Sequence, residues 1–223
     1  MNSQKWIWWV VWVTVIVGSK SMVQGQDVCL RSFFLGRNTS VMPSSQLKVS
    51  HHCEYLRPRR IVVVTAKNRE DRLDEQDHFA RALARSLMSS PGGFSVVVSQ
   101  EKLCENELPM RRGYFNEQEL VALNHKYQAD AVLYCDLRRL VSFAPMSVEG
   151  SLVMVHIDQA VALVGLQEVY DLRTPATRRS YDGFSVAGQC KDSFGCTHLQ
   201  SPAQLIEFVA HQSVQQLLKA WSF

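Results

Sequence analysis

The sequence lacks the short motifs that mark common nucleotide sites and catalytic nucleophiles. It contains no G-x-x-x-x-G-K-[ST] loop to hold phosphates, and no G-x-G-x-x-G run follows its first predicted strand. The segment Gly183–Gly188 resembles a nucleophile elbow only loosely, because its spacing is one residue too long. We therefore expect no cofactor and no catalytic residue, and we predict that the protein is not an enzyme.

A strong excess of one charge is also missing, since 24 Lys and Arg residues stand against 21 Asp and Glu residues. Lys5 and Lys20 belong to an N-terminal leader, and without them 22 basic residues face 21 acidic ones, a net charge of +1. This balance does not predict the clustered basic surface that a nucleic-acid-binding protein has. The strongest basic run, Arg57-Pro58-Arg59-Arg60, directly precedes an apolar strand, and we interpret it as a solvated approach to that strand.

The apolar run near the N-terminus is short. Residues 6–18 are apolar and follow Lys5, but the run ends at Gly18, short of the roughly 20 apolar residues that a transmembrane helix needs. This anatomy predicts a signal peptide over residues 1–25, with cleavage after Ser21 or Gly25. We therefore expect an exported protein of a bacterial-type cell envelope, located in the periplasm or anchored to a membrane and facing the periplasm.

An uncleaved leader is the alternative to a cleaved signal peptide. In that case the leader's tryptophans would contact the membrane at its interface, where Trp is favoured; they are Trp6, Trp8, Trp9 and Trp12. Lipid attachment is not expected at Cys29. Gln26-Asp27-Val28 precedes this cysteine in place of the apolar and small residues that lipidation requires.

Six cysteines permit disulfides in an exported protein. Cys190 and Cys196 flank a short glycine-containing loop that is able to bring their ends together, so they are the first candidate pair. Cys29 and Cys53 are a second candidate pair, which would close a loop ahead of the folded core. Cys135 shares a strand face with apolar neighbours and is expected to be a buried thiol.

The residue patterns predict an irregular arm over residues 26–59 and a single α/β domain over residues 60–223. Apolar strands that alternate with amphipathic helices predict parallel strands joined by right-handed crossovers. After Pro145 apolar and polar residues alternate along the chain, which predicts an antiparallel meander. The expected order is β-α-β-α-β-β-β-β-α, a mixed sheet covered by helices, with strands at 61–65, 94–99, 129–140, 151–164, 167–173 and 180–187 and helices at 74–89, 116–127 and 202–221.

The best grouping of metal-ligating or proton-transferring residues is His156 and Asp158 on one strand face, with Asp136 on a neighbouring strand. Imidazole and carboxylates supply lone pairs and titratable protons. The trio therefore defines an alternative function, an envelope metal-binding protein or enzyme. An antiparallel sheet with one solvent-exposed face also has polar residues at every second position of a strand. We favour that interpretation and assign no metal ligand.

The turn after the third predicted strand contains Phe143, Pro145 and Met146. Apolar residues in a turn either pack against their own domain or form a patch that binds a partner. We take these three as candidate partner-binding residues. The expected partner is another envelope protein or a second copy of the chain.

Three segments resemble a known group of envelope proteins: Phe79–Leu83, Phe94–Val98 and Ala129–Leu137. They are similar to the core of curli-secretion lipoproteins of the CsgG type, of penicillin-binding-protein activators of the LpoB type, and of the N-terminal domain of the Tol-system protein TolB. The resemblance covers residues 60–221 and implies a helix-covered sheet and a periplasmic adaptor that binds another envelope protein. The connections after Leu140 are too short for the barrel hairpins of curli-type pores, so pore formation is not expected.

Overall fold

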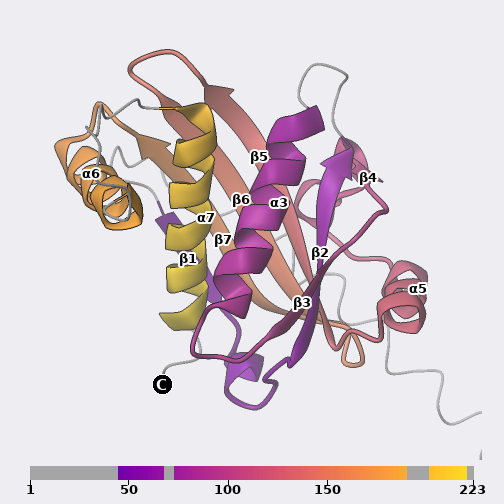
Figure 1. Ribbon diagram of the computed structural model, residues 1–223. Helices are drawn as coiled ribbons and strands as arrows, with labels where there is room; N and C mark the ends of the chain where they lie inside the picture. Colours follow the sequence, from indigo (N-terminus) through magenta and orange to yellow (C-terminus); the bar gives the residue numbers. More distant parts are fainter. Residues whose placement is uncertain (1–44, 68–72, 190–200, 220–223) are drawn as a thin grey trace, which may run out of the picture.

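The computed structural model describes residues 45–67, 73–189 and 201–219, and Figure 1 shows their arrangement. The fold is α/β, with helices packed on a mixed sheet, as predicted from the sequence. The strands are β1 (Ser45–Val49), β2 (Arg60–Lys67), β3 (Ser95–Val98), β4 (Leu103–Cys104), β5 (Ala131–Val141), β6 (Ser147–His156) and β7 (Val161–Asp171). The helices are η1 (His51–Glu54), α3 (Leu73–Met88), η3 (Glu105–Glu107), α4 (Pro109–Arg112), α5 (Glu117–Tyr127), α6 (Pro175–Gln189) and α7 (Pro202–Lys219).

The sheet has the strand order β1-β7-β6-β5-β2-β3, and β4 pairs with the end of β2. β2 is parallel to β3 and β5, as the predicted crossovers require. β5, β6, β7 and β1 are antiparallel neighbours. Because β5 runs parallel to β2 and β3, the end of β5 and the starts of β2 and β3 lie at opposite ends of the sheet.

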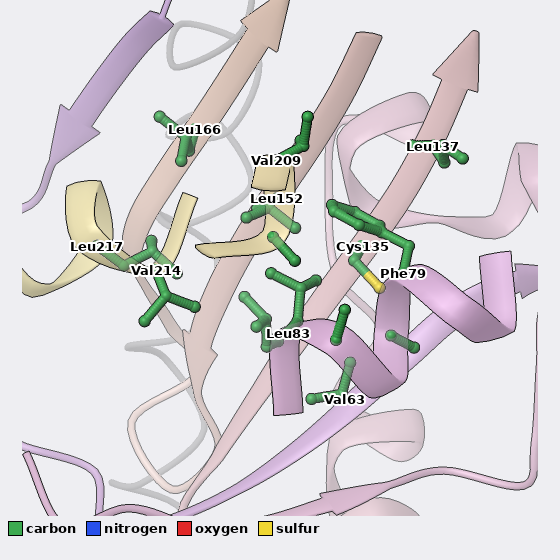
Figure 2. Packing of buried hydrophobic residues seen from close by; sticks show 14 of the residues in the cluster. Val63, Phe79, Leu83, Cys135, Leu137, Leu152, Leu166, Val209, Val214 and Leu217 are labelled. Carbon is green, nitrogen blue, oxygen red and sulfur yellow. The ribbon is translucent and has the colours of Figure 1, made fainter. Parts of the chain in front are cut away.

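Helices α3 and α7 lie side by side across one face of the sheet (Figure 1). Phe79 and Leu83 of α3 and Val209 of α7 pack on Cys135 and Leu152 of the sheet, as Figure 2 shows. Full burial of such a side chain stabilises a fold by about 1.5–3 kcal/mol. The predicted burial of Cys135 is confirmed, and this burial raises the pKa of its thiol.

The other face of the sheet is covered over β2 and β5 by α4 and α5. Met110 of α4 and Leu120 of α5 belong to one apolar cluster with Tyr134 of β5. The start of α5 follows the sequence prediction, because the Asn116 side chain accepts a hydrogen bond from the N–H of Gln118 at 2.9 Å. This contact satisfies one of the N–H groups that every helix leaves free at its first turn.

A side chain takes the place of a neighbouring strand where β5 extends beyond its pairing with β2. Gln76 of α3 accepts a hydrogen bond from the N–H of Leu137 at 3.0 Å and donates one to the carbonyl of Leu137 at 3.1 Å. The Gln76 side chain is buried. Its amide therefore satisfies both main-chain groups of Leu137, which would otherwise be buried without partners.

We expect Gln76→Leu to lower the free energy of unfolding by about 2–4 kcal/mol, since each unpaired buried polar group costs about 1–3 kcal/mol. Urea unfolding followed by circular dichroism measures the change. Gln118→Leu is the matched control, because the Gln118 side chain is exposed on α5. Equal losses in the two variants would contradict the role assigned to the Gln76 amide.

The predicted N-terminal arm over residues 26–59 needs correction, because part of it belongs to the sheet. Residues 45–49 form β1, which pairs with β7 from Ser45 opposite Glu168 to Val49 opposite Val164. Leu47 packs against the main core, and η1 follows directly. The folded domain therefore includes residues well before Arg60.

The predicted strand at 180–187 is wrong, since this segment lies within helix α6. The first helical bond runs from the N–H of Arg178 to the carbonyl of Thr174 at 3.0 Å. Tyr181 and Phe184 are three residues apart, and both rings meet Phe208 of α7 edge-on, at centroid distances of 5.5 and 5.6 Å. This spacing is helical and places both rings on one helix face.

Candidate functional site

The turn between β5 and β6 presents an exposed aromatic ring. Phe143 is 85% exposed, the largest exposed fraction among the large apolar residues of the described chain, and Pro145 is exposed beside it. Met146 is buried instead, and its carbonyl accepts a hydrogen bond from the N–H of Leu172 at 3.0 Å. Of the three candidate residues in this turn, two therefore face solvent, while Met146 anchors the turn to the core.

A pocket of about 390 Å³ lies beside this turn and is lined by both strands of the hairpin and by the end of β7. Val169 of β7 is 38% exposed within it, and Arg139 contributes a cation to the same lining. We call Phe143, Pro145, Arg139 and Val169 the Phe143 surface. An apolar ring beside a pocket with a charged rim is the arrangement found at protein-binding patches.

The charges at the border of the Phe143 surface are partly compensated. Arg173 forms an ion pair with Asp171, with 2.6 Å between Nη2 and Oδ2. Hydrogen bonds from the Arg173 guanidinium lower the pKa of Asp171. Both groups are near water, where such pairs contribute little to stability.

Asp136 lies at the same end of the sheet but inside the protein. Its Oδ2 is 3.1 Å from Arg111 Nη2 of α4, and its Oδ1 accepts a hydrogen bond from Gln76 at 3.4 Å. Arg138 lies 3.8 Å from the Asp136 carboxylate, and its guanidinium also reaches Glu149 at 3.6 Å. The carboxylate is 97% buried and fully engaged by these neighbours, so its geometry is that of an internal ion pair.

The structure does not bring His156, Asp158 and Asp136 together. Asp136 is paired with Ser151, five residues before His156, a separation of about 17 Å along a strand. His156 faces the same side of the sheet as its partner Ala131, whereas Asp136 faces the other side. In the described ranges no three His, Cys, Asp or Glu side chains are grouped for a metal ion.

The described cysteines are free thiols. Cys53 is buried and donates a hydrogen bond to the carbonyl of Leu163 at 3.0 Å, and burial raises the pKa of its thiol to about 11. The expected pairing of Cys53 with Cys29 is therefore not formed in this structure. Cys29, Cys190 and Cys196 lie outside the described residues, so the Cys190–Cys196 bridge stays a prediction.

One further carboxylate is buried, at the contact between β7 and α7. Glu168 accepts hydrogen bonds from the hydroxyl of Tyr170 at 2.8 Å and from the hydroxyl of Ser213. Burial raises the pKa of Glu168, and the two hydrogen bonds act in the opposite direction. These two partners are neutral hydroxyls, and the one from Ser213 joins the sheet to α7.

No protein-family model matches the sequence, and no curated protein sequence matches it either. Among the helices of the described ranges, none is long and apolar enough to cross a membrane.

Several solved structures resemble the fold. A PelC dodecamer from Paraburkholderia phytofirmans is 10% identical, with a TM-score of 0.47 over 78% of this chain and 97% of that one. Lipoprotein GNA1162 from Neisseria meningitidis is 17% identical, with a TM-score of 0.37 over 62% of this chain and 100% of that one. The LpoB C-terminal domain from Salmonella enterica is 11% identical, with a TM-score of 0.31 over 52% of this chain and 85% of that one.

All three TM-scores lie below 0.5 and all three identities below 20%. These likenesses are too distant to place the chain in a family or to assign it a function.

Proposed function

We propose that the protein is a non-enzymatic interaction module of the cell envelope, which binds another envelope protein through the Phe143 surface. The leader at residues 6–18 supports the location, in the periplasm or anchored to a membrane and facing it. The observation that carries the proposal is the 85% exposed ring of Phe143 beside the pocket that includes Val169. No cofactor is needed for this function.

The energy available at this surface supports a partner-binding role. Burial of an exposed Phe side chain contributes about 1.5–3 kcal/mol, and aromatic anchors at the centre of an interface carry a large share of binding energy. The Phe143 ring stands on a hairpin held by the long β5–β6 ladder and by Met146 below it. A rigid support of this kind reduces the entropy lost on binding.

Photo-crosslinking in the native cell envelope tests the proposal. A photoreactive phenylalanine analogue at position 143 of the full chain is expected to give one discrete crosslinked protein, identified by mass spectrometry. The same analogue at position 121 is the control, because Val121 is 53% exposed but lies on α5. Identical adducts from the two positions would contradict binding at the Phe143 surface.

A matched substitution then measures the contribution of the ring. We expect Phe143→Ser to raise the Kd for the crosslinked partner about 30-fold, the effect of losing an interface anchor worth about 2 kcal/mol. The melting temperature should stay within about 2 °C of the unsubstituted protein, because the side chain makes little contact with the fold. Unchanged affinity would overturn the assignment of this surface.

A further inference from the structure

A larger pocket lies at the other end of the sheet from the Phe143 surface. Its volume is about 810 Å³, and segments far apart in the sequence line it: the approach to β2, the turn after α3 and the last turn of α7. The last turn of α7, near the bottom of Figure 1, lies at this end. We call it the basic pocket, because Arg57, Arg59 and Lys219 line it and no acidic residue of the described ranges does.

Two of the three cations have no acidic partner among the described side chains. Arg57 and Arg59 are exposed, and neither guanidinium forms an ion pair there. The carboxylate of Asp130 binds the main chain here, since its two oxygens accept hydrogen bonds from the N–H groups of Arg59 and Arg60 at 2.7 Å each. Asp130 therefore fixes the backbone of Arg59 and leaves its side chain available.

Helix ends reduce this positive charge but do not cancel it. α3 and α7 both end at this pocket, and each helix C-terminus is equivalent to about half a negative charge. Arg57 and Arg59 against roughly one unit of negative helix-end charge leave about one positive charge at the pocket. The basic pocket is therefore suited to an anionic group.

The wall of the basic pocket is apolar and aromatic. Tyr55 is 76% exposed at its rim, and Phe94 lies against Gly92, where a Cβ atom would come within 2.3 Å of Phe94 Cε2. The absence of a side chain at Gly92 thus leaves room for the Phe94 ring in the wall. A ligand that carries both negative charge and apolar groups is therefore complementary to this pocket.

We propose that the basic pocket binds an acidic peptide segment of a partner protein, with carboxylates on Arg57 and Arg59 and an apolar side chain against Tyr55 and Phe94. Guanidinium groups match carboxylates through paired hydrogen bonds. A phosphate is less well suited, because α3 and α7 approach the pocket with their C-terminal ends and offer none of the helix N–H groups that usually hold phosphates. This inference goes beyond the Phe143 surface, because it gives the domain a second protein-binding site at the opposite end of the sheet.

Isothermal titration calorimetry of the full chain tests this proposal with a blocked hexapeptide of the order Asp-Glu-Phe-Asp-Glu-Phe. We expect binding that weakens about tenfold or more between low and high salt, since it depends on partly exposed charges. Two control peptides separate the contribution of negative charge from that of apolar contact. One replaces the acidic residues by Asn and Gln, and the other replaces both Phe residues by Ser. Each control is expected to bind more weakly than the parent peptide.

Matched variants locate the site. The double variant Arg57→Gln/Arg59→Gln should raise the peptide Kd about tenfold or more, and Tyr55→Ser should raise it for the parent peptide but not for the Ser control. Arg178→Gln/Arg179→Gln removes the same charge from the exposed surface of α6, and it should bind like the unsubstituted chain. All of these side chains are exposed, so the variants are expected to fold, and their melting curves check this.

Several results would overturn the proposal. One is the absence of peptide binding at low salt, and another is an equal loss of peptide affinity in the Arg178→Gln/Arg179→Gln control. A third is peptide binding seen only after deletion of residues 220–223, which would make the chain's own end the occupant. Stronger binding of inorganic phosphate, or of phosphatidylglycerol vesicles without any peptide binding, would assign the pocket to a phosphate or a lipid surface instead. None of these outcomes depends on Phe143, so the two surfaces are tested separately.

Discussion

A variant that lacks residues 1–59 is expected to lose cooperative unfolding, whereas a variant that lacks only residues 1–44 keeps it. The longer deletion removes β1 and η1. β1 pairs with β7 over five residues, and the N–H of Ser50 extends the contact to the carbonyl of Leu163 at 2.8 Å. Without this strand, β7 becomes a long, apolar edge, which is a site of aggregation.

The size of the expected loss follows from what the deleted segment buries. Each main-chain hydrogen bond contributes about 0.5–1.5 kcal/mol net, and Leu47 and Cys53 add apolar burial in the main core. The sum is comparable to the whole free energy of unfolding of an ordinary domain, about 5–15 kcal/mol. Thermal and urea unfolding of both deletion variants measure the difference. Equal melting temperatures would contradict the inclusion of β1 in the folded unit.

Strong local patterns predicted β2, α3 and the start of α5 correctly. The apolar run at 61–65 is buried in β2, and Phe79, Leu83 and Leu87, spaced four residues apart, face the core from α3. The cap at Asn116 begins α5 as its sequence indicates. In these segments periodicity and capping agree with the tertiary environment, which is why sequence alone was sufficient.

The errors come from segments whose structure depends on distant partners. β1 is a short edge strand with polar neighbours, and its ladder partner, β7, lies more than a hundred residues later in the sequence. Tyr181 and Phe184 form a helical pair whose common neighbour, Phe208, lies on α7. The local sequence of a segment does not show its contacts with distant residues. In such segments tertiary packing determines whether the chain forms a strand or a helix.

The candidate surfaces were predictable to different degrees. Apolar residues in the turn at 143–146 already indicated a patch, but only the hairpin register shows that Phe143 is exposed and Met146 is buried. The run Arg57–Arg60 was interpreted as a solvated approach to a strand. That interpretation could not include the basic pocket, because α7 and the turn after α3 supply the rest of its wall.

Arg111→Met is expected to lower the free energy of unfolding by about 3 kcal/mol, because it leaves the carboxylate of Asp136 buried with a weakened set of partners. Gln76 still donates one hydrogen bond, but Arg138 lies 3.8 Å away and is shared with Glu149. Chemical denaturation of purified protein measures the change. Arg173→Met is the control, since it breaks an exposed ion pair and should cost no more than about 1 kcal/mol.

The double variant Asp136→Leu/Arg111→Met separates a structural role of Asp136 from a chemical one. A buried ion pair replaced on both sides by apolar groups often leaves stability unchanged, so the double variant should recover to within about 1 kcal/mol of the unsubstituted protein. Binding of the partner at the Phe143 surface should recover with it. A stable double variant that had lost partner binding would show that Asp136 acts beyond the fold, and a double variant as unstable as Arg111→Met would contradict the internal ion pair.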